Sequence, residues 1–314
     1  MIKRNVLLNP GPATTTDTVK LAQVVPDICP REKEFADLMK GFRSDILKTV
    51  HADPAAYTAV LFCGSGTLNM DVCLNSLLPA DAKALIVNNG AYSSRAVEIC
   101  KAYGLNHIDL RFPVDELPDL TRVESVLKEN PDIRLVYTTH NETGTGICNP
   151  IREIGALAHR YGATFVVDTT STLAMRPIDV ARDNIDFCMA SAQKGIMAMT
   201  GLSFVIGRTD LIVASKDYPK RSYYCNLYLQ YEYFEKTGQM HFTPPLSRPS
   251  MPPFRGLRNT LPKAKSRSGN VTSAFSRRFI RGWPSSDLRM SFAANGKAVW
   301  WSRSYIRTTR TGTL

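Results

Sequence analysis

One carboxylate and one amine have the residue types and the spacing to do chemistry together. Asp168 opens the run DTTST, and Lys194, 26 positions further on, lies in the run SAQKG. Each run follows a short apolar stretch that predicts a strand. A carboxylate directly after Phe-Val-Val is costly to bury unless a cation meets it. A partly desolvated lysine loses its proton more easily and becomes a nucleophile.

This acid and this amine together suit a pyridine-based cofactor. A protonated pyridine nitrogen is a cation that Asp168 could stabilise, which keeps a pyridoxal ring an electron sink. Lys194 would then supply the amine that forms a Schiff base. From these two residues alone an alternative stays open, in which Asp168 forms a salt bridge with a nearby base and Lys194 is exposed on a loop.

A glycine-rich turn offers a candidate phosphate site. The run CGSGT, residues 63–67, follows a predicted strand and precedes a predicted helix over residues 68–78. Backbone N–H groups at a helix N-terminus are free to hold a phosphate, and Ser65 and Thr67 add hydroxyls. The run is neither a Walker loop nor G-x-G-x-x-G, so neither a nucleoside triphosphate nor a dinucleotide is indicated. A plain strand-to-helix turn with Thr67 near the cap is the alternative.

Two further polar runs follow predicted strands. NNGAY ends at Tyr92, whose ring could lie flat on a heteroaromatic ring, with ordinary packing as the alternative. HNETGTG contains Thr143, which could hydrogen-bond a cofactor oxygen, with a loop-capping threonine as the alternative. The sequence has no H-E-x-x-H spacing, no C-x-x-C pair and no G-x-S-x-G elbow. We therefore predict neither a metal site nor a serine nucleophile.

These runs need a sheet that brings the ends of several strands together. Short apolar runs alternate with amphipathic stretches, which predicts a largely parallel α/β sheet covered on both faces. The clearest predicted helix begins after Pro150 and closes at Gly162, with its apolar residues on one face. Ligands bind at the carboxyl ends of such strands, so Asp168 and Lys194 would project into one crevice. The predicted strands are residues 58–62, 84–87, 133–138, 164–167, 187–190 and 204–206.

Charge and composition divide the chain near Pro245. The net charge is +11, but residues 246–314 hold 14 basic residues and one acidic residue, so residues 1–245 are nearly neutral. Residues 246–314 are rich in Ser, Arg and Pro and show no strand or helix period, which predicts disorder. A basic arm for nucleic acid is the less favoured alternative, and we do not expect nucleic acid as a partner.

The remaining composition indicates a globular enzyme without a membrane segment. The 314 residues are enough to bury a large core, and no apolar run reaches the roughly 18 residues that span a bilayer. The seven cysteines are odd in number and scattered, which argues against a disulfide framework. We predict a cytoplasmic location.

Taken together, these runs resemble the class V aminotransferases of fold type I. The resemblance runs from the N-terminus to about Pro245 and implies a large α/β domain over residues 1–245 that binds pyridoxal 5'-phosphate. The matching runs are NPGP (9–12), GSGT (64–67), NGAY (89–92), HNETG (140–144), VD (167–168), SAQK (191–194) and MHFTPP (240–245).

The resemblance also implies a role for each site residue. Lys194 would be the catalytic Schiff-base lysine, and Asp168 would pair with the pyridine nitrogen. Tyr92 would stack on the ring, and Thr143 would contact its oxygen. The family works as a homodimer with shared active sites. The phosphate would be surrounded by Ser65, Gly66, Thr67 and Gln193, with Thr243 reaching over from the other subunit.

The members that the chain resembles most transfer the amino group of 2-aminoethylphosphonate to pyruvate, which gives phosphonoacetaldehyde and L-alanine in phosphonate degradation. Two alternatives remain at this point. One is a class V enzyme that uses serine or alanine with glyoxylate, and the other is a non-catalytic remnant that binds only the cofactor.

The resemblance ends after Pro245. Family members continue through a helix into a small C-terminal domain, whose arginine grips the acidic group of the substrate, whereas residues 246–314 form an atypical basic tail. Translation out of the original reading frame would produce such a jump, a hypothesis that the other frames of the gene would test. We expect weak or absent turnover from this chain, with cofactor capture retained.

Overall fold

The chain divides into two units, Met1–Ser266 and Arg267–Leu314. The structure is a computed structural model that describes residues 6–24, 26–240, 255–257, 259, 288–292 and 298–302. In the second unit, strands β10 (Leu288–Phe292) and β11 (Ala298–Ser302) pair antiparallel. The prediction of a disordered or out-of-frame tail over residues 246–314 lies for the most part outside the described residues.

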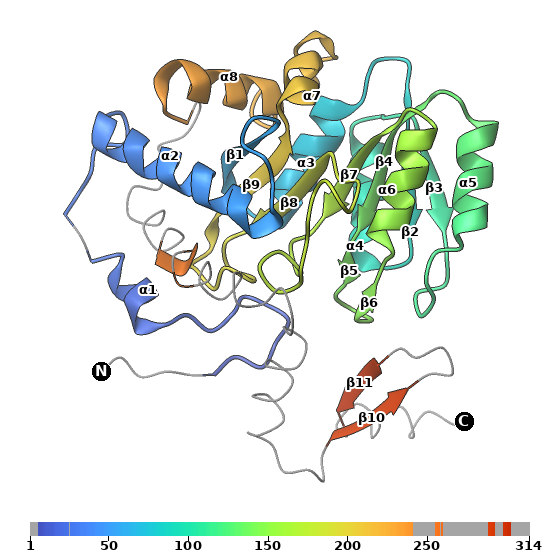
Figure 1. The fold of residues 1–314 in the computed structure, drawn as a ribbon, viewed down its shortest axis with the longest axis horizontal. Coiled ribbons are helices and arrows are strands. Elements are labelled where there is room, and N and C mark those ends of the chain that lie inside the picture. The colour runs from blue at the N-terminus through green and yellow to red at the C-terminus, as the bar shows by residue number, and fades with distance from the viewer. Residues whose placement is uncertain are drawn as a thin grey trace. The chain divides into compact units, whose positions relative to one another are not determined.

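One seven-stranded sheet organises the first unit, in the order β1-β9-β8-β7-β4-β2-β3 (Figure 1). Neighbours from β8 to β3 pair in parallel, whereas β9 pairs antiparallel with both β8 and β1. The reversal at β9 follows from the short link of residues 192–200, because a parallel crossover needs a dozen residues or more. The strands are β1 (Tyr57–Gly64), β2 (Lys83–Asn88), β3 (His107–Arg111), β4 (Ile133–Thr139), β7 (Thr164–Asp168), β8 (Phe187–Ser191) and β9 (Gly201–Arg208).

The six predicted strands are confirmed, and the sheet has one strand that the sequence did not reveal. Strand β3, with the sequence HIDLR, lies at the edge of the sheet and buries only Leu110. An edge strand can carry charged side chains because it has solvent on one side. Its sequence therefore lacks the apolar run that identified the other strands.

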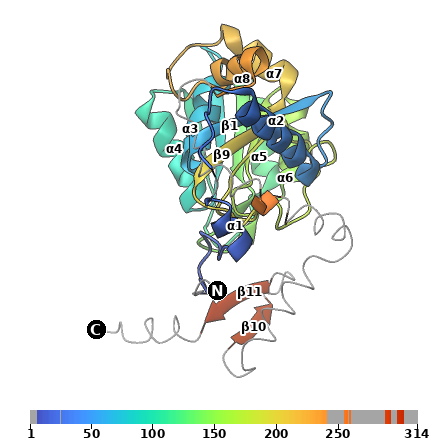
Figure 2. The same cartoon turned by 90° about the vertical axis from the view of Figure 1, so that its left-hand side faces the viewer.

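Helices cover both faces of the sheet, as the βα pattern predicted. Side chains alternate along each strand, so Leu85 and Val87 pack in the cluster that includes α2, α5 and α6, whereas Ala84 and Ile86 pack with α3 and α4. Figure 2 shows these two helical layers on opposite sides of the sheet. The helices are α1 (Asp17–Leu21), α2 (Lys33–Leu47), α3 (Gly66–Leu77), α4 (Ala91–Ala102), α5 (Leu120–Glu129), α6 (Ile151–Arg160), α7 (Thr209–Ala214) and α8 (Leu227–Thr237), with 3-10 turns η1 (Lys48–Val50) and η2 (Ser215–Asp217).

Both helices predicted from the sequence are present. Helix α6 buries its apolar face, and Gly162 after its end has a left-handed backbone with φ of 71°. Helix α3 begins two residues earlier than predicted, at Gly66, because Ser65 already has the extended backbone of an N-cap. In the described part of the chain, no helix is long and apolar enough to cross a membrane.

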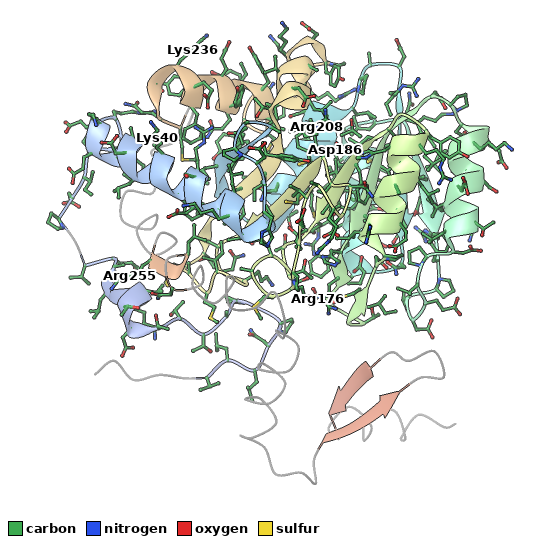
Figure 3. The ribbon with its side chains drawn as sticks, viewed as in Figure 1. Lys40, Arg176, Asp186, Arg208, Lys236 and Arg255 are labelled. Atoms are coloured by element: carbon green, nitrogen blue, oxygen red, sulfur yellow. The ribbon has the colours of Figure 1, made fainter. Side chains whose placement is uncertain are left out.

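A buried carboxylate at the amino edge of the sheet ties several elements together. Asp186, which precedes β8 and is 2% exposed, accepts hydrogen bonds from Nε2 of His159 (2.8 Å), the guanidinium of Arg208 (3.3 Å) and the backbone N–H of Phe165 (2.8 Å). Figure 3 shows Asp186 and Arg208 beside each other, at the opposite edge of the sheet from Arg176. The Asp186 carboxylate raises the pKa of His159.

The His159 interaction makes part of the folding stability depend on pH. Because the folded-state pKa of His159 lies above its unfolded value of about 6.5, its contribution is fully present below that value and is lost as the pH rises through the folded pKa. We expect His159→Gln to lower the free energy of unfolding by about 0.5–1 kcal/mol near pH 5.5 and by less near pH 9. Urea unfolding at the two pH values measures this, and an equal loss at both would contradict it.

Candidate active site

The carboxyl ends of five strands meet at one edge of the sheet, and the predicted site residues follow those ends. Strands β1, β2, β4, β7 and β8 all point the same way, since β9 is antiparallel to its two neighbours. In the pairing register Asp168 lies between Thr139 of β4 and Met189 of β8. Loops from distant parts of the sequence therefore converge beside Asp168.

Lys194 lies in the loop after β8, against the N-terminal segment. Its Nζ atom donates to the carbonyl oxygen of Pro10 at 3.5 Å, and the backbone N–H of Ala13 donates to the carbonyl of Gln193 at 2.8 Å. A side chain at Gly11 would overlap Lys194, so the glycine of the NPGP run allows this close approach. Burial lowers the pKa of the half-buried Lys194 amine, while the Asp168 charge acts in the opposite direction. The amine is thus closer to its nucleophilic, neutral form than a lysine in water.

Asp168 is the last residue of β7 and is only 4% exposed. Its Oδ1 accepts the backbone N–H of Thr170 at 2.8 Å. Burial raises the pKa of this carboxyl, and the hydrogen bonds from Thr170 act in the opposite direction. Within the described residues no salt bridge reaches Asp168. The structure therefore does not show, in that part of the chain, the alternative in which a basic side chain neutralises Asp168.

The glycine turn after β1 forms the N-terminus of helix α3, where no side chain of the N-cap residue occupies the first N–H groups. Ser65 is the N-cap residue, and its side chain makes no capping hydrogen bond. Gly66 lies close to Thr170, since an added Cβ would come within 2.9 Å of the threonine Oγ1. Thr67 Oγ1 accepts a hydrogen bond of 3.0 Å from the guanidinium of Arg95 in α4. The sequence did not single out Arg95.

Tyr92 and Thr143 lie at the same edge of the sheet. Thr243 is not among the described residues. Tyr92 is in the first turn of α4, and the Arg95 guanidinium carbon lies 4.9 Å from the centroid of its ring. Thr143 is half-buried in the turn between strands β5 (Asn141–Glu142) and β6 (Ile147–Cys148).

Buried oxygens without a hydrogen-bond partner gather at this edge. Native proteins leave few buried polar atoms unpaired, so a cluster of them indicates a place for a polar ligand or water. Among the described residues the cluster at the carboxyl ends consists of Thr138 Oγ1, Thr139 Oγ1, Thr170 Oγ1, Ser191 Oγ and Gln193 Oε1. No group of three or more His, Cys, Asp and Glu residues able to hold a metal ion occurs in the same described part of the chain.

Glu142 is a site residue that the sequence reading missed. It is 1% exposed and belongs to the HNETGTG run, and its carboxylate accepts hydrogen bonds from the backbone at the start of α4. Glu142 is the one acidic residue in the HNETGTG loop and lies next to Thr143, and this position could have marked it as a site residue. The direction of its side chain could not be read from that loop.

The model of the class V aminotransferase family matches residues 19–240. The chain belongs to this family. Class V aminotransferases depend on pyridoxal phosphate, and the lysine, aspartate and glycine turn described above lie within the matched range.

Class V relatives with curated names share more than a third of the aligned residues. The chain is 37% identical over 239 residues to a 2-aminoethylphosphonate–pyruvate transaminase of Lysinibacillus sphaericus, which covers 76% of this chain and 65% of the relative. It is 38% identical over 248 residues to an enzyme of the same name from Salmonella typhimurium, covering 78% and 67%. The chain thus spans about two thirds of the length of these class V relatives.

Solved aminotransferase structures have the same fold. An alanine–glyoxylate aminotransferase from Nostoc sp. superimposes with a TM-score of 0.79 at 21% identity, covering 95% of this chain and 78% of that one. An aspartate aminotransferase from Thermus thermophilus gives 0.77 at 17% identity, covering 97% of both chains. The predicted fold type I aminotransferase fold is confirmed.

The pKa of His140 provides a test of burial at the site. His140 is 8% exposed, and burial, followed by the charge of Arg176, lowers its pKa to about 4. We expect His140 to stay neutral at about pH 6, where a histidine of the unfolded chain is largely protonated. Stability then falls through this group as the pH drops below about 6.5. NMR titration of carbon-13-labelled histidines measures its midpoint, and a value near 6.5 for His140 would contradict the burial.

Proposed function

We propose that this chain is the cofactor-binding part of a pyridoxal-phosphate-dependent transaminase that transfers the amino group of 2-aminoethylphosphonate to pyruvate. The observation that carries the proposal is the pair formed by Lys194 and Asp168. A half-buried amine with a lowered pKa lies within electrostatic reach of a buried carboxylate, and no salt bridge reaches that carboxylate in the described residues. The names of the relatives at 37–38% identity support the substrates.

The residues at this edge fit pyridoxal phosphate. Asp168 could meet the protonated pyridine nitrogen, which would supply the cation that the buried carboxylate lacks. The open N-terminus of α3 suits a phosphate, because its first N–H groups carry the positive end of the helix dipole. Unpaired buried oxygens at Thr170 and Gln193 adjoin that turn and the lysine loop. In this assignment Ser65, Gly66, Thr67 and Gln193 hold the phosphate, Tyr92 covers the ring and Thr143 contacts the ring oxygen.

The bound cofactor supplies an electron sink for the carbon that loses its proton. Lys194 would hold the cofactor through its Nζ atom. Toward the substrate carbon the same amine would act as general base and then general acid, accepting a proton and returning it. The close packing of Lys194 against residues 10 and 11 limits the positions that its amine can take. Asp168 would supply the negative charge that stabilises the protonated ring nitrogen.

The assembly and the location of the protein are parts of the same proposal. We propose a homodimer in which Thr243 of the partner subunit completes the phosphate site. The buried thiols of Cys73, Cys100, Cys188 and Cys225 are free, which supports a reducing compartment and a cytoplasmic location. Residues 246–314 are proposed to contribute little to substrate binding, so cofactor capture by this chain should be easier to observe than turnover.

Covalent capture of the cofactor tests the role of Lys194. With pyridoxal phosphate and borohydride, we expect a stable adduct on the peptide that contains Lys194, because its amine is the reactive one at this edge. Lys194→Ala should abolish the adduct, while Lys236→Ala, which removes an exposed lysine on α8, should leave it unchanged. Peptide mass spectrometry provides the measurement. A protein that stays colourless with pyridoxal phosphate, or labelling spread over surface lysines, would contradict the proposal.

Replacing the buried carboxylate tests the role of Asp168. Asp168→Asn keeps the shape and removes the charge that stabilises the pyridinium. We expect borohydride trapping to persist while the first half-reaction with 2-aminoethylphosphonate slows by about 100-fold or more. Stopped-flow absorbance of the bound chromophore in a single turnover measures this rate. An unchanged rate would remove Asp168 from the mechanism.

The amino donor can be tested on the same chromophore. Alanine and serine are compared with 2-aminoethylphosphonate at equal concentration. The proposal expects the phosphonate to convert the bound chromophore fastest. A preference for alanine or serine would instead assign the chain to the glyoxylate-dependent enzymes, and colour with no response to any donor would indicate a cofactor-binding protein without catalysis.

A further inference from the structure

Glu142 caps the start of helix α4 from a different part of the chain. Its Oε2 accepts the backbone N–H of Tyr92 at 3.1 Å, and its Oε1 accepts the backbone N–H of Ser93 at 2.8 Å. The hydroxyl of Ser93 donates to the same Oε1 at 2.6 Å. The N-cap residue of α4 is Gly90, which has no side chain to do this, so an acid about 50 positions away satisfies the first turn.

The local structure shows that the carboxylate fits tightly in this position. A Cβ atom at Gly90 would overlap the carboxyl group of Glu142, so the glycine leaves the space that the acid fills. Within the described residues, no salt bridge reaches Glu142, and its charge faces the N-terminal N–H groups of α4. An anion in that position is stabilised by the helix dipole and by charge-assisted hydrogen bonds.

The same turn of α4 carries the aromatic residue assigned to the cofactor ring. Tyr92 is fixed through its backbone by Glu142, and its ring lies under the guanidinium of Arg95 at 4.9 Å. Arg95 also donates to Thr67 Oγ1 in the glycine turn. One carboxylate and one guanidinium therefore set where the ring of Tyr92 stands relative to the proposed phosphate site.

We propose that Glu142 is a positioning residue, which holds the first turn of α4 so that Tyr92 presents its ring to the cofactor. The inference rests on the proposed function, because it concerns how the same site is held in shape. Glu142 does not contact the reacting atoms in this assignment. Its effect passes through the N–H groups of Tyr92 and Ser93.

The test compares two acids that cap helices in different places. Glu142→Gln keeps the size of the side chain but replaces one acceptor oxygen by an N–H₂ group that cannot accept. Asp119→Asn is the matched control, because Oδ1 of Asp119 accepts the backbone N–H of Thr121 at the start of α5. Each variant loses a charged cap, and only the first should affect the cofactor.

Three quantities are measured on both variants and on the unsubstituted chain. They are amide hydrogen exchange at residues 92 and 93, the dissociation constant for pyridoxal phosphate, and the visible circular dichroism per bound cofactor. For Glu142→Gln we expect exchange at these amides to rise about tenfold and cofactor affinity to fall about tenfold, as the loss of one charge-assisted hydrogen bond implies. The dichroism should change because the ring beside the chromophore is displaced. Asp119→Asn should alter exchange only near Thr121.

The outcomes separate this inference from the proposed function. If the unsubstituted chain traps no cofactor, the proposed function fails and the positioning role fails with it, although exchange still reports whether Glu142 holds the helix. If the unsubstituted chain binds cofactor, and Glu142→Gln leaves both affinity and dichroism unchanged, the positioning role alone is overturned. Should Glu142→Gln not fold, Ser93→Ala removes the hydroxyl donor to Oε1. A smaller change in the dichroism of that variant would support the inference, and no change would contradict it.

Discussion

A buried carboxylate that no salt bridge reaches in the described part of the chain is the constraint around which this site is built. Asp168 ends a buried strand in the middle of the sheet, where burial raises its pKa and the backbone N–H of Thr170 donates to its Oδ1. Burying such a charge unpaired is costly. The cost is acceptable in an enzyme whose ligand brings a positive charge to that place. The class V aminotransferase family uses a cofactor that does so.

The two edges of the sheet each hold a buried acid, and the two acids differ in their hydrogen-bond and salt-bridge partners. At the amino edge, Asp186 is bonded by His159, Arg208 and the backbone of Phe165, and the cluster joins α6, β8 and β9. At the carboxyl edge, no salt bridge reaches Asp168 in the described residues, and hydroxyls without a hydrogen-bond partner lie at the ends of the neighbouring strands β4 and β8. The first arrangement stabilises the fold. The second leaves hydrogen-bonding capacity for a ligand.

Contacts between distant segments hold the carboxyl edge in shape. The N-terminal run NPGP packs against Lys194, Thr170 packs against Gly66, and Glu142 caps the helix that carries Tyr92. Arg95 then links that helix to the glycine turn. Each glycine in these contacts marks a place where a side chain would overlap a neighbour, which explains why the motifs contain glycine at those points.

The sequence by itself determined the α/β sheet, six of its seven strands and the helix after Pro150, and it predicts that Asp168 and Lys194 project into one crevice. These features follow from local periodicity and from the rule that parallel strands end at one edge. Only the tertiary structure revealed β3, whose edge position permits a polar sequence, and the roles of Glu142 and Arg95. Their partners lie 49 to 50 and 28 positions away in the sequence, and the direction of such side chains depends on how the loops pack. Periodicity carries no information about contacts of that kind.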